Sequence, residues 1–201
     1  PLESAEELAR SPDEAVAELA SIAEYERLFR AAFPGSAKAV TTQHLAQSLA
    51  VFVRAFVSDR APYDQYLRGD RLALSASDLR GVQLFAEVGC AECHVPPHFD
   101  SERYADRHVP NPEQIVDDGR FEHTSDEADR FAFHVPTLRN LRFSPPYFHN
   151  GGIETFEAAV AHELNEQVAN GQGRALSAAE TADLLGFLRR ALVDISREQY
   201  R

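Results

Sequence analysis

One pentapeptide, Cys90-Ala91-Glu92-Cys93-His94, constrains this chain more than any other feature of its sequence. C-x-x-C-H is the attachment signature of c-type haem, in which two thiols bond to the haem and the adjacent histidine binds the iron. The chain has 2 cysteines, so a single haem accounts for both. A zinc site would need a second ligand pair at matching spacing, and a redox dithiol would need a βαβ context that the sequence lacks. The sequence therefore predicts one covalently bound haem c, around which the chain must fold.

The charge composition of the chain limits the classes of partner that it could bind. The chain has 201 residues with 20 basic and 32 acidic side chains, a formal net charge of -12. This charge argues against nucleic acid and against an anionic membrane surface. We expect no membrane span, because no apolar run approaches the required length. Since haem attachment to C-x-x-C-H normally follows export, we expect a periplasmic location.

The chain contains no methionine. Electron-transfer haems of the c type commonly use a methionine sulfur as the sixth iron ligand, which raises the reduction potential. The iron here must be bound by His94 together with a nitrogen, an oxygen or nothing, and each option lowers the potential relative to His/Met ligation. A simple high-potential electron carrier is therefore disfavoured.

The pattern of caps and apolar residues predicts an all-α fold with long irregular connections. The expected helices run from Ser11 to about Phe33, from Thr41 or Thr42 to Ser58, from Ser75 to Gly89, from Thr155 to about Asn170, and from Ser177 through Leu192. The stretch from Val95 to Ile153 is rich in proline and aromatic residues. A stretch of this length without regular structure is usually functional, so we expect it to wrap the haem.

Several segments, taken in order, resemble the bacterial dihaem cytochrome c peroxidase and MauG family. They are Gly81–Phe85 leading into the haem motif, Val135–Asn140, Pro146–Gly152 and the terminal helix beginning at Leu176–Glu180. The upstream segment Tyr63–Asp70 resembles the piece that joins the two haem domains of that family. The resemblance covers essentially the whole chain.

The resemblance also implies a division of the chain. Family members carry two C-x-x-C-H motifs and this chain carries one, so it resembles the C-terminal part, which holds the second, electron-transfer haem. We expect residues 1–70 to be a helical remnant of the first haem domain with its linker, residues 71–193 a c-type cytochrome domain, and residues 194–201 a tail. The peroxide-binding haem would then belong to an absent segment or a separate polypeptide.

The resemblance assigns roles to residues near the haems. Glu3 matches the family's acid/base at the peroxide-binding haem, and His149 matches a histidine kept beside the second haem. The family's sixth ligand, Met or Tyr, falls on Glu163. This departure leaves three alternatives: weak carboxylate ligation, a water site, or ligation by the neighbouring His162. Of the two residues, we expect Glu163 to lie near the iron.

Two further roles follow from the same resemblance. Arg120 lies in a stretch that fits the family and could pair with a haem propionate. The family binds calcium partly through backbone carbonyls, which by position would be those of Ser144 and Pro146; backbone oxygens suit a hard cation.

Two classes of function remain open. In the first, the chain is the electron-transfer portion of a dihaem peroxidase or MauG-like oxidase. It would connect hydrogen peroxide chemistry at the other haem to an external donor (a small cytochrome or cupredoxin) or to a protein substrate. In the second, it is a stand-alone low-potential monohaem cytochrome that carries electrons between partner proteins. The length of the chain favours the first.

Overall fold

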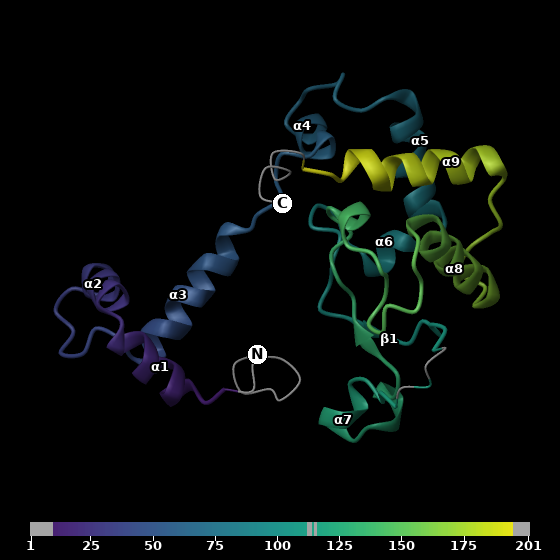
Figure 1. The fold of residues 1–201 in the computed structure, drawn as a ribbon. Helices are drawn as coiled ribbons and strands as arrows, with labels where there is room; N and C mark the ends of the chain where they lie inside the picture. Colours follow the sequence, from purple (N-terminus) through teal and green to yellow (C-terminus); the bar gives the residue numbers. More distant parts are fainter. Residues whose placement is uncertain (1–9, 112–113, 115, 195–201) are drawn as a thin grey trace. The chain divides into compact units, whose positions relative to one another are not determined.

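The computed structural model describes residues 10–111, 114 and 116–194. The chain divides into two compact units, Pro1–Val57 and Ser58–Arg201 (Figure 1). The expected assignment of residues 1–70 and 71–193 to two haem domains stays a prediction, while the structural division falls between Val57 and Ser58. Glu3 lies outside the described residues.

The first unit contains three helices, α1 (Pro12–Ser21), α2 (Ala23–Ala32) and α3 (Thr42–Ala55). The prediction of one helix from Ser11 to about Phe33 is wrong, because Ile22 is extended, with φ −95° and ψ 110°. An unbroken helix would hold Ala15 and Phe29 about 21 Å apart at 1.5 Å per residue. The break lets both side chains enter one small core, with Ala39, Val40 and Leu45.

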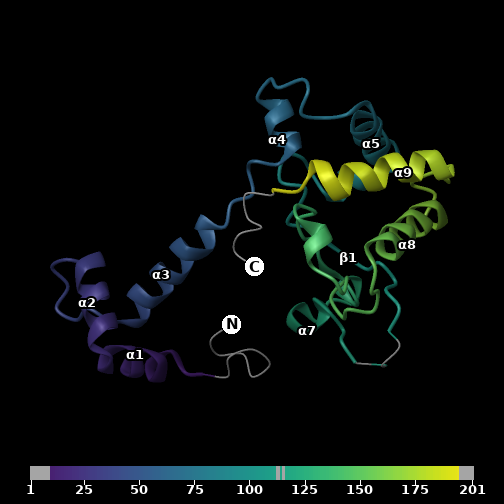
Figure 2. The same ribbon diagram turned by 45° about the horizontal axis from the view of Figure 1, so that its top comes forward.

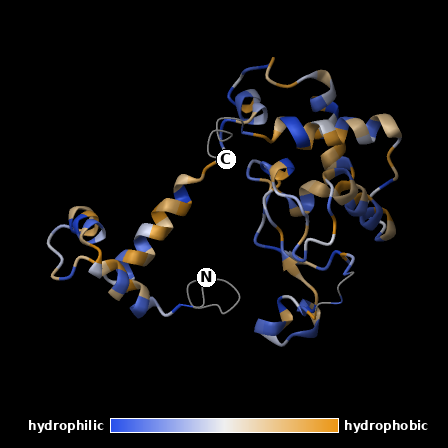
Figure 3. Ribbon diagram, viewed as in Figure 1, coloured by the Kyte–Doolittle hydropathy of each residue, from blue (hydrophilic) through white to orange (hydrophobic). Residues whose placement is uncertain are grey.

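The apolar stripe on α3 is mostly exposed. Leu45 is buried in the small core of the first unit. Leu49, Phe52 and Val53 follow it on the helix and are 44%, 61% and 66% exposed. Figure 3 shows the hydrophobic residues of α3 extending along the helix. A contiguous exposed apolar surface of this kind commonly marks an interaction site.

The second unit is mostly helical and confirms the coarse fold class. Its helices are α4 (Pro62–Leu67), α5 (Ala76–Glu87), α6 (Cys90–Cys93), α7 (Phe121–Thr124), α8 (Phe156–Ala169) and α9 (Ala178–Gly186), with 3₁₀ turns η1 (Glu127–Asp129) and η2 (Leu141–Phe143) and the π-helical turn η3 (Phe187–Ala191) that continues α9. Two short strands, β1 (Tyr104–Ala105) and β2 (Phe133–His134), pair antiparallel, with Tyr104 opposite His134. Figures 1 and 2 show α9 and α5 crossing at one end of the unit, with the long connections and β1 at the other.

The predicted helix starts are confirmed at the positions where capping residues indicated them. Ser75 and Ser177 each accept a hydrogen bond from the backbone three residues on, while the third residue of each helix returns a carboxylate to the cap backbone. Thr155 caps α8 through its hydroxyl. These reciprocal bonds satisfy donors that a helix N-terminus otherwise leaves unpaired. Helix α4, in contrast, was not expected from the sequence.

An aromatic cluster forms the centre of the second unit. Phe99 meets Tyr63, Phe85 and Phe187 edge to face, with ring centroids 5.0, 5.7 and 6.0 Å apart. Edge-to-face contact between the rings adds to the free energy gained from their burial. Because Phe99 belongs to the loop after the haem motif, this cluster fixes that loop against α4, α5 and η3.

A buried ion pair joins three separate segments beside this cluster. Arg139 donates from Nη1 and Nη2 to the two carboxylate oxygens of Asp64, at 2.9 and 2.6 Å. Its Nε and Nη2 also donate to the carbonyl of Pro97, at 3.0 and 2.6 Å. The two charged side chains are 8% and 9% exposed, so removing either one would leave the other buried without its partner.

We expect Arg139→Leu to lower the free energy of unfolding by about 3–5 kcal/mol, because the carboxylate of Asp64 would stay buried without its cation. Denaturant unfolding of the haem-loaded protein measures this loss. The matched control is Arg68→Leu, which removes an exposed pair with Asp59 at 3.6 Å and should cost less than about 1 kcal/mol. Equal losses in the two variants would contradict the importance of the buried pair.

We expect Gly81→Ala to destabilise the packing of α5 on α9. A β-carbon at Gly81 would lie 2.5 Å from the carbonyl oxygen of Asp183 and 2.5 Å from Cβ of Phe187. Overpacking of this kind costs about 1–3 kcal/mol. Thermal unfolding checks it, with Gln83→Ala on the exposed face of α5 as control, which should change stability by less than about 0.5 kcal/mol. An unchanged stability of Gly81→Ala would contradict this prediction, because it would show that α5 and α9 can move apart to make room for the methyl group.

Candidate haem-attachment site

The haem motif lies on the short helix α6, directly after α5. Gly89 has φ +83°, in the left-handed region that glycine adopts without steric cost. Helix α5 ends at Glu87, and after the turn at Gly89 helix α6 begins at Cys90. Cys90 and Cys93 are both free thiols of intermediate exposure, and both belong to the same helical turn. They can therefore bond to one group lying alongside α6.

The ring of His94 is oriented by two backbone carbonyls. Its Nδ1 lies 3.0 Å from the carbonyl oxygen of Pro136 and 3.2 Å from that of Phe99. A carbonyl oxygen can only accept, so Nδ1 carries the proton and Nε2 of the neutral ring keeps its lone pair. Burial lowers the pKa of His94, although the two carbonyls oppose that shift. A neutral imidazole whose other nitrogen donates to a backbone carbonyl is the usual form of a metal-binding histidine.

Helix α8 crosses the start of the motif. The side chain of Gln167 is 8% exposed, and its Nε2 would lie 3.0 Å from a β-carbon built on Gly89. Leu164 packs against the same core cluster as Cys90. Residues four apart lie on one face of a helix, so Glu163 shares the face that Gln167 turns toward the motif. Burial, followed by the charge of Glu163, raises the pKa of Cys90 to about 12.

Glu163 is held by an arginine that the sequence analysis did not identify. Nε of Arg107 donates to Oε2 of Glu163 at 2.9 Å, and Nη2 lies 2.7 Å from the same oxygen. Burial by itself lowers the pKa of Arg107, but the hydrogen bond and charge of Glu163 outweigh it, so the pKa is raised overall. No local signal marked Arg107, because its partner lies in a distant helix.

The loop around Arg107 is attached to α8 by two more contacts. Nε2 of His162 bonds to the carbonyl of Arg107 at 2.7 Å. Nδ1 of His108 lies 2.9 Å from the carboxylate of Glu166. The two candidates for the sixth iron ligand, His162 and Glu163, are thus both engaged by one loop, while the identity of that ligand stays a prediction.

The residues of the motif region fit a haem. Two thiols and an imidazole with a free lone pair lie within the pentapeptide Cys90–His94. Nη2 of Arg107 is also buried without a hydrogen-bond partner in the described part of the chain, although it lies against the Glu163 oxygen.

His149 lies against a strand of the second unit. Its ring stacks on Phe133 of β2, with centroids 3.5 Å apart and planes 5° from parallel. Burial lowers the pKa of His149, while Asp117 and Asp106 oppose the shift. The structure thus supports this ring through Phe133, and its expected place beside the haem stays a prediction.

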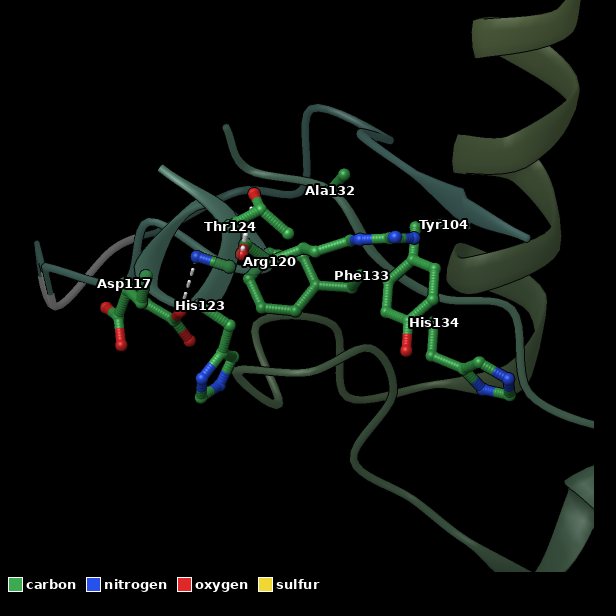
Figure 4. A pocket seen from close by; sticks show the side chains of 10 residues that line it. Tyr104, Asp117, Arg120, His123, Thr124, Ala132, Phe133 and His134 are labelled. Carbon is green, nitrogen blue, oxygen red and sulfur yellow. Dashed lines mark hydrogen bonds between the residues drawn. The ribbon is translucent and has the colours of Figure 1, made fainter. Parts of the chain in front are cut away.

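Arg120 lines a surface cavity of about 530 Å³ with Tyr104, Phe133 and His134 (Figure 4). Its guanidinium carbon lies 4.2 Å from the centroid of the Tyr104 ring, and Nε lies 3.2 Å from a carboxylate oxygen of Asp129. A haem propionate would have to compete with these contacts, so the predicted pairing gains no support from the geometry.

The calcium prediction is likewise untested. Ser144 and Pro146 lie in an exposed loop, where the Ser144 hydroxyl donates to the carbonyl of Leu141 at 3.1 Å. Across the described ranges, no group of three or more His, Cys, Asp or Glu side chains is placed to hold a metal ion. Among those same residues, no helix is long and apolar enough to cross a membrane.

Comparison with known proteins connects this geometry to one family. A family model described as di-haem cytochrome c peroxidase matches residues 1–72. Cytochrome c551 peroxidase of Pseudomonas aeruginosa is 31% identical over 94% of this chain and 55% of its own length. The methylamine utilization protein MauG of Methylorubrum extorquens is 35% identical over 82% of this chain and 46% of its own length. The chain therefore spans about half the length of these curated relatives.

Solved structures show the same fold. A MauG-like protein associated with microbial copper homeostasis superposes with a TM-score of 0.80 and 24% identity, over 97% of this chain and 68% of its own. The diheme peroxidase BthA from Burkholderia thailandensis gives a TM-score of 0.73 at 20% identity. The family of these sequence relatives implies c-type haem, in agreement with the motif on α6. The chain belongs to the bacterial dihaem cytochrome c peroxidase and MauG family.

Proposed function

We propose that this chain carries the electron-transfer haem of a dihaem peroxidase or MauG-like oxidase. It would pass oxidising equivalents between a peroxide-reactive haem outside this chain and an external donor, a small cytochrome or cupredoxin, or a protein substrate. One observation carries the proposal. A single C-x-x-C-H motif, with His94 oriented for metal binding, is the one attachment site in a sequence that spans about half of its dihaem relatives.

The residues of this chain would bind and orient the haem. Cys90 and Cys93 would form the two thioether bonds, and Nε2 of His94 would bind the iron. The carbonyls of Phe99 and Pro136 hold the His94 ring through Nδ1, which fixes its orientation and increases its basicity as a ligand. The haem supplies one-electron redox chemistry when bound. Because the chain has no methionine, its potential should be low.

The first unit supports the proposed connection to a second haem segment. The exposed apolar residues of α3, Leu49, Phe52 and Val53, form a surface that a soluble domain seldom leaves uncovered. The family model matches this part of the chain. We propose that the segment carrying the peroxide-reactive haem packs there, and that Glu3 and the calcium carbonyls of Ser144 and Pro146 serve that shared assembly. A periplasmic location would suit haem attachment after export.

We expect the mature protein to exceed its sequence mass by the mass of one haem. Cys90→Ala and Cys93→Ala should each keep haem attached through one thioether, while the double variant should lose all covalent haem. Intact-mass spectrometry under denaturing conditions measures this directly. Unmodified mass in the wild-type protein, isolated from a host with a haem-attachment system, would contradict the assignment of the site.

We expect the native complex to contain two haems, one of them on a polypeptide segment other than residues 1–201. Pyridine haemochrome analysis of the complex, together with its subunit masses, measures the ratio. Two haems per complex would support the dihaem enzyme, and such a complex should turn over peroxide with an electron donor. A ratio of one, with no companion segment, would replace this proposal with the stand-alone monohaem electron carrier.

A further inference from the structure

The contacts of Glu163 bear on how the iron is ligated opposite His94. Glu163 shares with Gln167 the face of α8 that meets Gly89, the residue directly before the haem motif. Leu164, the next residue on α8, packs against the core cluster that Cys90 also contacts, so Glu163 lies near the attachment site. Its carboxylate nevertheless already has a cationic partner in Arg107.

Arg107 is well placed to retain this carboxylate. The arginine and glutamate side chains are 22% and 33% exposed, so water screens their attraction only in part. The loop that carries Arg107 is itself anchored to α8, through His162 and through His108 with Glu166. Moving Glu163 away from Arg107 would leave a partly buried guanidinium without its counter-charge, which is unfavourable.

His162 is restrained by the same loop. Its Nε2 is hydrogen-bonded to the backbone of Arg107, and its ring meets Phe148 edge to face with centroids 5.3 Å apart. A histidine that bound the iron through Nε2 would have to give up the first of these contacts. Ligation by His162 through Nε2 is therefore disfavoured in this arrangement.

We propose that Arg107 is a positioning residue that holds the Glu163 carboxylate in an ion pair and so keeps it off the haem iron, which leaves the position opposite His94 to water or to an added ligand. The inference rests on the haem attachment of the proposed function. The inference adds to the proposed function a property of the iron, because an iron with an accessible sixth position binds small ligands, whereas an iron with two protein ligands resists them.

The test is a spectral titration of the ferric, haem-loaded protein with imidazole, a neutral ligand whose affinity responds little to changes of nearby charge. Wild-type protein should bind imidazole and show a high-spin ferric EPR signal before it is added. Arg107→Leu should free Glu163 to bind the iron and so weaken imidazole binding by at least about tenfold. The double variant Arg107→Leu with Glu163→Gln should restore wild-type affinity.

Two variants control for loss of structure. Arg107→Lys keeps the charge and should stay within about threefold of wild type. Arg189→Leu removes another ion pair to α8, with Glu157, and should have no effect on imidazole affinity. Both are judged on protein whose covalent haem content has been confirmed by mass, so that absence of haem, which would refute the proposed function, is recognised separately.

Three results would overturn the inference. A low-spin wild-type spectrum of an iron with two nitrogen ligands would place a histidine on the iron. A gain of about tenfold or more in imidazole affinity in Glu163→Gln alone would show that the carboxylate already binds the iron in the wild type. Unchanged affinity in Arg107→Leu would show that Arg107 does not restrain Glu163.

Discussion

Arg139 binds both carboxylate oxygens of Asp64 and the carbonyl of Pro97, and these contacts connect α4, the loop after the haem motif and the segment from Val135 to Asn140. The carbonyl of Pro136, which orients His94, belongs to the same segment as Arg139. A guanidinium has a planar, forked set of donors, so one side chain can satisfy a bidentate carboxylate and a carbonyl together. The segment that orients His94 is therefore held by an ion pair outside the C-x-x-C-H motif, and aromatic packing around Phe99 supports both.

The other side of the site depends on α8. This helix contacts the turn before Cys90 through Gln167 and presents Glu163 to the loop at Arg107. An uncharged side chain at position 163 would have no charge to neutralise. A carboxylate must be paired when partly buried, and Arg107 supplies the pairing. The surroundings of Glu163 thus depend on a neighbour that is distant in the sequence.

Much of the local structure could be read from the sequence because its causes are local. Ser75, Thr155 and Ser177 start helices where predicted, since a capping side chain bonds to a backbone amide only two or three residues away. The break at Ile22 could not be read, because helical periodicity continues through it. It is decided by the gain from packing Phe29 with Ala15 and Leu45. Helix α4 carries local signals that were missed: Pro62 is its first residue, and the carboxylate of Asp64 accepts a hydrogen bond from the amide of Ala61.

The sequence by itself determined the C-x-x-C-H motif with its histidine, the class of cofactor that this motif predicts and the absence of methionine, because these depend on residue identity at fixed spacing. Only the tertiary structure decided the contacts of the predicted site residues: the carbonyls on His94, the stacking of Phe133 on His149, and the pairing of Glu163 with Arg107. Each of these contacts joins residues far apart in the chain. Their energies arise from burial and from charge neutralisation in a folded core, which the order of residues along the chain does not display.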